Sequence, residues 1–170
     1  MKVPRPEHPE PMLERETWLN LNGRWHFSVD WDRRGREEQW YLEPSLEDWI
    51  TVPFPPESRL SGIGCTEFMP SVWYSREFHI PPDMRGGRIL LHFGACDYET
   101  SVWINGFHIG SHVGGYTPFS FEVDKYLVDG KNVLVVEARD DNRTGIQPCG
   151  KQSPKRESYG CRYTRVTGIW

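Results

Sequence analysis

Three consecutive polar side chains, Asp140, Asp141 and Asn142, are the residues best placed to bind a polar ligand. They end a long run rich in β-branched residues and open a polar segment. Strand ends and loops carry ligand contacts disproportionately often, and a carboxylate can accept hydrogen bonds from two hydroxyl groups at once. Asp and Asn are also frequent turn residues, so a solvated turn explains the same three residues. Both interpretations remain open from the residues alone.

Other chemistry finds little support in the sequence. The stretch from Gly145 to Lys151 matches the first seven positions of a phosphate-binding loop, but Gln152 stands where that loop needs a hydroxyl for Mg²⁺. His108 and His112 are four residues apart on a predicted hairpin arm, where they need not share a face. No two acidic residues are singled out as the pair that glycoside hydrolysis requires. We predict no catalytic residue, no metal and no cofactor in this chain.

The overall charge excludes a nucleic-acid partner from our expectations. The 170 residues contain 20 Lys and Arg against 24 Asp and Glu, a net charge of −4. The basic group Arg33, Arg34 and Arg36 is offset at once by Glu37 and Glu38, whereas nucleic-acid binding needs a clustered positive face. No apolar run reaches the 18 residues of a membrane span, so no membrane partner is predicted.

The spacing of the four cysteines helps to predict the cellular compartment of the protein. Cys65, Cys96, Cys149 and Cys161 show no CxxC spacing, which argues against a zinc knuckle or a redox motif. In a chain of this size they favour free thiols in a reducing environment, although a Cys149–Cys161 disulfide remains an alternative. The start lacks the apolar core of a signal peptide. These features predict a cytoplasmic protein.

Hydrophobic alternation with a period of two residues predicts most of the secondary structure. Trp25, Phe27, Val29 and Trp31 alternate with polar residues over 24–31. The same reasoning predicts one helical turn at 46–49, and strand character returns from 159 to 170. The other predicted strands cover 49–52, 72–80, 88–93, 98–104, 107–110, 119–123 and 132–139, with 88–93 apolar enough to be buried on both faces.

The clearest local signal is Asn105-Gly106, which separates two strand-like runs. Both positions of a type I′ turn need positive φ, which Asn and Gly tolerate, so a tight hairpin is predicted here. About eight short strands with almost no helix are typical of an antiparallel β-sandwich of the jelly-roll kind.

The domain organisation expected is an extended arm over 1–20, which is rich in proline and charge, followed by one jelly-roll domain over 21–170. Residues 140–156 form a long polar loop, and loops of this length are commonly functional or disordered. The last five residues end on the apolar pair Ile169-Trp170. We therefore expect the chain to be part of a longer, truncated protein.

Several stretches, in their order and spacing, resemble the sugar-binding N-terminal domain of glycoside hydrolase family 2, which includes β-galactosidases, β-glucuronidases and β-mannosidases. The resemblance covers nearly the whole chain from Leu21. The stretches that carry it are LNGRW at 21–25, VP at 52–53, WYSREF at 73–78, FGACDY at 93–98, VWING at 102–106, GGYTPF at 114–119, GKQ at 150–152 and YTRVTGIW at 163–170.

The resemblance implies a jelly-roll sandwich, which agrees with the strand pattern. It also implies that the parent enzyme continues into an immunoglobulin-like domain and a (β/α)₈ barrel. The two catalytic glutamates of the retaining mechanism would lie on the barrel, one of them in an Asn-Glu dipeptide that this chain lacks. The chain alone is therefore expected to be inactive, within a parent that hydrolyses O-glycosidic bonds.

The resemblance implies that loops of this domain contact the sugar at the rim of the active site. Asp140 stands where the family often has an acidic residue. Arg162 lies six residues before Gly168, where many galactosidases and glucuronidases carry Asp, which leaves the sugar open. Arg162 could pair with the carboxylate of a uronic acid or form an ordinary surface ion pair. With Tyr163 added, the predicted substrate-binding set is Asp140, Asp141, Asn142, Arg162 and Tyr163.

The expected partners are a carbohydrate with a β-glycosidic bond and the remaining domains of the parent, and a homo-oligomer stays open. Two alternatives compete with the rim role. One is a stand-alone carbohydrate-binding module, and the other is a purely structural domain that supports the barrel. Fold alone does not decide among them.

Overall fold

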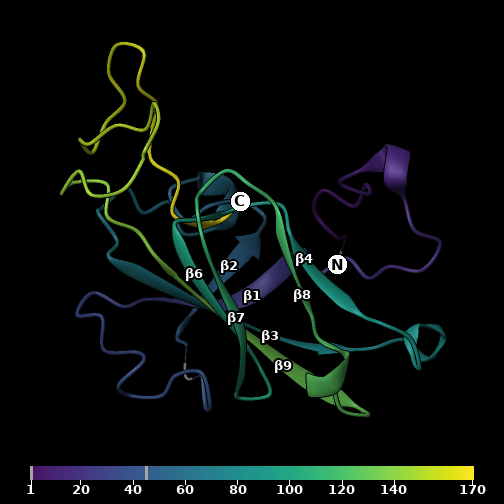
Figure 1. The fold of residues 1–170 in the computed structure, drawn as a ribbon. Coiled ribbons are helices and arrows are strands. Elements are labelled where there is room, and N and C mark those ends of the chain that lie inside the picture. The colour runs from purple at the N-terminus through teal and green to yellow at the C-terminus, as the bar shows by residue number, and fades with distance from the viewer. Residues whose placement is uncertain (1, 45) are drawn as a thin grey trace.

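The computed structural model describes residues 2–44 and 46–170, and over these residues it is built from β-strands and short 3₁₀ turns (Figure 1). No helix in this part of the chain is long and apolar enough to cross a membrane. The strands are β1 (Gly23–Val29), β2 (Asp48–Val52), β3 (Ser71–His79), β4 (Leu90–Phe93), β5 (Cys96–Asp97), β6 (Glu99–Ile104), β7 (Phe107–Val113), β8 (Phe119–Glu122), β9 (Lys131–Arg139) and β10 (Gly168–Ile169).

The strands form two layers, as a jelly-roll sandwich requires. Six strands make one antiparallel sheet in the order β2-β1-β3-β9-β6-β7. The pairs β4–β8 and β5–β10, also antiparallel, make the opposing layer, and Figure 1 shows β4 and β8 running alongside the large sheet. The predicted all-β, antiparallel jelly-roll fold is confirmed.

The centre of the large sheet is the β3–β9 pair, which aligns nine residues on each strand, from Ser71 opposite Arg139 to His79 opposite Lys131. Successive side chains of a strand point to opposite faces. On β3, Tyr74 therefore enters the main core between the layers, whereas Trp73 enters a second cluster on the outer face.

That outer cluster is covered by the segment between β1 and β2. The Trp73 and Trp103 rings stack with centroids 5.5 Å apart, and Tyr41 stacks on Trp103 at 5.3 Å. The indole N–H of Trp73 donates to the Asp30 carboxylate at 3.1 Å. The large sheet is consequently buried on both faces at this point, which explains how so many aromatic residues are accommodated.

The Asn105-Gly106 hairpin is confirmed. Asn105 has φ of 51° and Gly106 has φ of 82°, the positive values that a type I′ turn requires. The Asn105 side chain strengthens the turn, because its amide donates to the Tyr126 carbonyl at 2.9 Å and to the Asn132 side chain at 2.8 Å.

Three local predictions are wrong. Residues 46–49 form no helical turn, because Asp48 already pairs with Phe27 as β2 begins. The strand at 88–93 is not buried on both faces: Leu90 is 39% exposed, since β4 belongs to the thin outer layer. Between 159 and 170, only Gly168 and Ile169 form a strand, and the rest is held by turns and side chains.

The N-terminal segment contains a 3₁₀ turn, Pro11–Leu13. It is tied to the sandwich through Asn22, whose side-chain amide lies 3.3 Å from the carbonyl oxygens of both Pro4 and Arg5.

Candidate functional site

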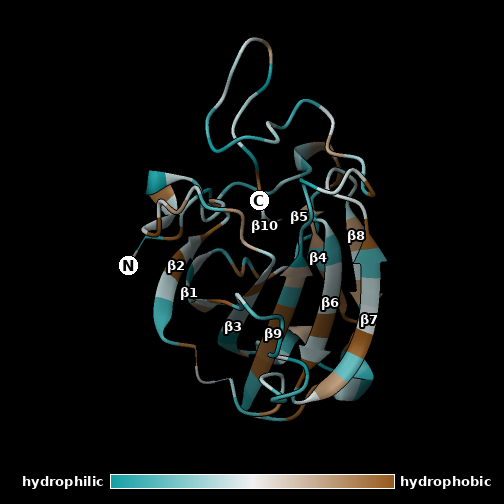
Figure 2. Ribbon diagram, turned by 90° about the vertical axis from the view of Figure 1, so that its left-hand side faces the viewer, coloured by the Kyte–Doolittle hydropathy of each residue, from teal (hydrophilic) through white to brown (hydrophobic). Residues whose placement is uncertain are grey.

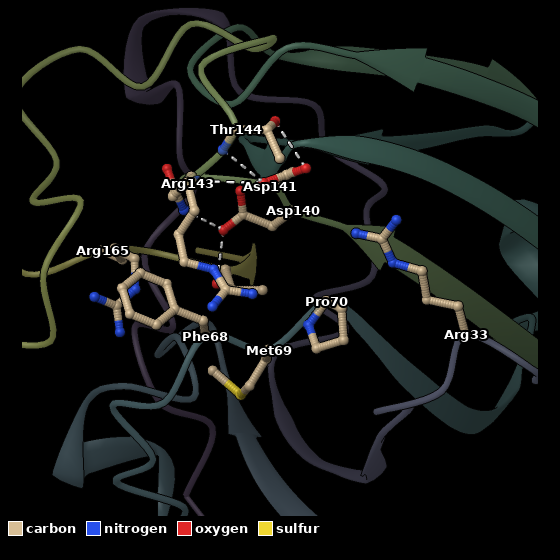
Figure 3. Close-up of a pocket in the computed structure, with 11 residues that line it drawn as sticks. Arg33, Phe68, Met69, Pro70, Asp140, Asp141, Arg143, Thr144 and Arg165 are labelled. Atoms are coloured by element: carbon tan, nitrogen blue, oxygen red, sulfur yellow. Dashed lines mark hydrogen bonds between the residues drawn. The ribbon is translucent and has the colours of Figure 1, made fainter.

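A cavity of about 100 Å³ lies where β9 ends and the polar segment begins (Figure 3). The strand delivers Asp140 to this point, and residues from the β2–β3 connection and from the C-terminal segment close around it. Its lining comprises Arg33, Phe68, Met69, Pro70, Asp140, Asp141, Asn142, Arg143, Thr144, Arg165 and Thr167.

Asp140 is buried, and protein donors occupy both of its carboxylate oxygens. Oδ1 accepts from the Gln147 amide at 2.6 Å. Oδ2 accepts from Asn142 Nδ2 at 2.6 Å and from the Thr167 hydroxyl at 2.8 Å. Burial raises the pKa of Asp140, and these donors act against that rise. Asp140 therefore fastens three parts of the chain together, and none of its oxygens is left without a donor.

Thr167 joins Asp140 to a second buried acid, Glu57. The Thr167 backbone N–H donates to Glu57 Oε2 at 3.2 Å, while its hydroxyl donates to Asp140. Burial raises the pKa of Glu57 to about 7, and the charge of Asp140 acts in the same direction. The other oxygen of Glu57, Oε1, has no partner among the described residues.

Arg165 lines the cavity and places a positive charge near these acids. It is only 2% exposed, and its guanidinium donates to the backbone carbonyls of Thr66 and Lys155. The guanidinium lies 3.9 Å from the centroid of the Phe68 ring, and the Arg143 guanidinium lies 4.8 Å from the same centroid. Figure 3 shows the Phe68 ring between these two arginines.

Two buried polar atoms on residues that line the cavity have no protein partner among the described residues: Asn142 Oδ1 and Arg165 Nε. One is an acceptor and the other a donor. An unpaired buried polar group costs about 1–3 kcal/mol, and both atoms are closed off from solvent in the folded chain.

Asp141 shapes the loop instead of entering this network. Its Oδ1 accepts from the backbone N–H groups of Arg143 and Thr144, both at 3.2 Å, and its Oδ2 accepts from the Thr144 hydroxyl at 2.9 Å. This is the local turn chemistry typical of Asp. The turn interpretation therefore describes Asp141, and the ligand interpretation of the triplet stays a prediction.

The structure places Arg162 and Tyr163 apart from this cavity, in a second cluster. Arg162 Nη1 donates to the carbonyls of Gly150 and Gln152 at 3.3 and 3.0 Å, and no carboxylate partner is present among the described residues. The Tyr163 hydroxyl lies 3.2 Å from the Tyr116 hydroxyl. The five predicted residues are therefore split between two neighbourhoods.

Gln152 organises the second cluster around the buried Asp97. Its amide donates to Asp97 Oδ2 at 2.6 Å and to the Tyr116 hydroxyl at 3.0 Å, while its Oε1 accepts from the Val166 N–H at 2.8 Å. Burial, with a contribution from the charge of Asp140, raises the pKa of Asp97 to about 7. Gly115 lies so close that an added Cβ would come within 2.5 Å of the Asp97 carboxyl.

Sequence reasoning missed Glu57, Arg165 and Thr167. Glu57 and Thr167 are 110 positions apart in the sequence and meet only in the folded chain. A hint existed, because all three lie in or beside the family-like stretches VP at 52–53 and YTRVTGIW at 163–170. These motifs indicate the family, but a motif alone does not indicate which of its side chains share one hydrogen-bond network.

Chemically, this arrangement holds distant segments of the chain together. Both oxygens of Asp140 are occupied, and Glu57 does not line the cavity, so the two buried acids are not disposed to act on a substrate there. Within the described part of the chain, no three His, Cys, Asp or Glu side chains converge as metal ligands would. The four cysteines are free thiols.

The family model for "Glycosyl hydrolases family 2, sugar binding domain" matches residues 63–142, which include most of the large sheet and the Asp140–Asn142 triplet. The chain contains a glycoside hydrolase family 2 sugar-binding domain. It is homologous to the N-terminal region of β-glucuronidases. The resemblance drawn from the motifs is thereby confirmed.

Relatives of this sugar-binding domain include the β-glucuronidase of Paenibacillus borealis, 34% identical over 125 residues, and that of Homo sapiens, 34% identical over 134 residues. Each alignment covers 72% of this chain but only 21% and 20% of the relative. The chain thus spans about a fifth of the length of the proteins it matches.

Solved structures give the same result. The Lactobacillus rhamnosus β-glucuronidase superposes with a TM-score of 0.64 at 26% identity. A Ruminococcus gnavus β-glucuronidase in complex with D-glucuronic acid superposes with a TM-score of 0.62 at 25% identity. Both cover 71% of this chain and 21% of the other protein.

Proposed function

We propose that this chain is the non-catalytic sugar-binding domain of a family 2 glycosidase that hydrolyses β-glucuronides. In this proposal the segment after β9 lies at the rim of the sugar site, and the catalytic acids lie in a part of the protein outside these 170 residues. The proposal rests on the comparison with relatives. The matched relatives are β-glucuronidases, and this chain corresponds to about a fifth of the length of each.

The geometry of the cavity supports a positioning role for Asp140. Because its oxygens are occupied by Asn142, Gln147 and Thr167, this carboxylate holds the polar segment in place and leaves Asn142 Oδ1 as the free acceptor. Direct contact of Asn142 with a sugar hydroxyl requires the loop to move, because its Oδ1 is buried in this structure. Arg162, with its guanidinium bound to two loop carbonyls, supports the shape of the same segment.

The test compares two proteins: the 170-residue chain and the product of its reading frame followed beyond the Trp170 codon. Hydrolysis of 4-nitrophenyl β-D-glucuronide is measured for both, with the corresponding galactoside and mannoside as substrate controls. We expect the longer product to release nitrophenol from the glucuronide and the chain alone to release none. Turnover by the chain alone would overturn the proposal, as would a frame that stops at codon 170.

Variants in the longer product separate rim contact from support. Asn142→Leu should raise KM with a smaller change in kcat, because it removes both the unpaired acceptor and the hydrogen bond from Asn142 to Asp140. Asp141→Asn is the matched control, since an amide oxygen can still accept the local turn hydrogen bonds. Unchanged kinetics in both variants would favour a purely structural domain. The cytoplasmic location and homo-oligomerisation remain predictions.

A further inference from the structure

The segment 143–163, here called the basic loop, carries a charge opposite to that of the rest of the chain. It contains five cations and one acid, Glu157, for a net charge of +4. Since the whole chain has a net charge of −4, the remaining residues carry −8. These cations form no consecutive basic run, because they are spread over 21 positions. They are Arg143, Lys151, Lys155, Arg156 and Arg162.

The basic loop projects from the sandwich beyond the end of β9, as the yellow-green to yellow part of Figure 1 and the corresponding extension in Figure 2 show. Lys151, Lys155 and Arg156 are exposed. Only Arg156 forms an ion pair within the described residues, with the exposed Glu67. Much of this positive charge is therefore presented to solvent.

The outer part of the basic loop also curls around a shallow, open hollow lined by residues 155–159. The Lys155 ammonium lies 4.6 Å from the centroid of the Tyr159 ring, and Tyr159 is 42% exposed. The hollow thus combines two cations, Lys155 and Arg156, with an accessible aromatic face.

We propose that the basic loop binds an acidic oligosaccharide, a chain of uronic acid residues. Its carboxylates would pair with Lys155 and Arg156, because guanidinium and ammonium groups form charge-assisted hydrogen bonds with carboxylates. The apolar face of a sugar ring would lie on Tyr159. The choice of a glycan over other polyanions rests on the proposed function. The positive surface of the basic loop is observed independently of that function.

Binding is measured by calorimetric titration of the 170-residue chain with a short oligogalacturonate at low salt. The same oligomer with all carboxylates methyl-esterified is the neutral control. We expect binding of the acid form, loss of binding for the ester, and weakening as salt is added, because exposed charges are screened. Equal affinity for both forms, or no binding of the acid form, would overturn the proposal.

Matched variants locate the site. Lys155→Ala combined with Arg156→Ala should weaken binding by roughly tenfold, because each exposed ion pair contributes little by itself. Lys125→Ala is the control, because Lys125 lies 5.0 Å from the Tyr126 ring in a like arrangement outside the basic loop. Tyr159→Ala should weaken the acid form as well. An equal loss in the Lys125 variant would overturn the assignment to the basic loop.

Two further results would distinguish a glycan site from a general polyanion site and separate this proposal from the proposed function. A short single-stranded DNA bound as tightly as the oligogalacturonate, and lost equally in the Lys155 and Arg156 variant, would overturn the glycan in favour of a general polyanion site. Failure of oligogalacturonate binding leaves the nitrophenyl glucuronide assay unaffected, because that assay uses a monosaccharide and the longer product. The two proposals can therefore fail separately.

Discussion

Glu57 provides the sharpest test of the buried network, through the substitution Glu57→Gln. In the folded chain burial raises the pKa of Glu57 from 4.5 to about 7. A carboxyl with a raised folded pKa binds its proton more tightly in the native state than in the unfolded state, so stability falls as pH increases between the two pKa values. The loss begins near pH 4.5, is complete above about pH 7 and does not grow further.

The size of the effect follows from the same values. Each pKa unit corresponds to about 1.4 kcal/mol, so ionised Glu57 costs the folded chain about 3 kcal/mol above pH 7. Glutamine keeps the shape and the acceptor for the Thr167 N–H but cannot ionise. The variant should match the natural chain near pH 4.5 and exceed its free energy of unfolding by about 3 kcal/mol at pH 8.

Urea unfolding followed by tryptophan fluorescence at several pH values between 4.5 and 8 measures this difference. Asp97, whose pKa is also raised to about 7, adds a similar slope to both proteins and cancels when they are subtracted. Glu47→Gln, at an exposed glutamate, is the control and should leave the curve unchanged. Parallel stability curves for the natural chain and the Glu57 variant would refute a costly buried carboxylate at this position.

Two further substitutions test the packing and the polar network. Asp140→Asn should lower the free energy of unfolding by about 2 kcal/mol, because an amide cannot accept from all three donors; Asp141→Asn should cost much less, and equal losses in urea titrations would contradict the network. Trp103→Ala should cost about 3 kcal/mol by leaving a cavity in the outer aromatic cluster. Trp49→Ala, at a 43% exposed position, serves as its control, and calorimetric unfolding that fails to separate the two would contradict the packing.

Local features of the fold could be predicted because their causes are local. The Asn105-Gly106 turn follows from the φ values that these two residues tolerate. The alternation at Trp25 and Phe27 follows from one buried face of a strand, and both side chains are indeed in the core. The predicted strand over 24–31 is too long because Trp31, although apolar, lies beyond the end of β1 and is 53% exposed.

Asymmetric layers explain the less successful predictions. The run at 88–93 is apolar, but β4 pairs only with β8, so Leu90 is left partly in water. In contrast, Trp73 on β3 is buried on the outer face because the β1–β2 connection folds over it. Hydropathy alone does not say which segment will cover a sheet face.

The all-β class, the hairpin, the family and the polar segment after β9 could all be predicted, because they depend on the order and spacing of residues along the chain. The folded chain was needed to show that donors from the protein occupy the Asp140 carboxylate, that Glu57 and Arg165 lie beside it, and that Arg162 lies elsewhere. The physical reason is burial. Which carboxylate loses water, and which distant donor replaces that water, is set when segments 110 positions apart are brought into contact.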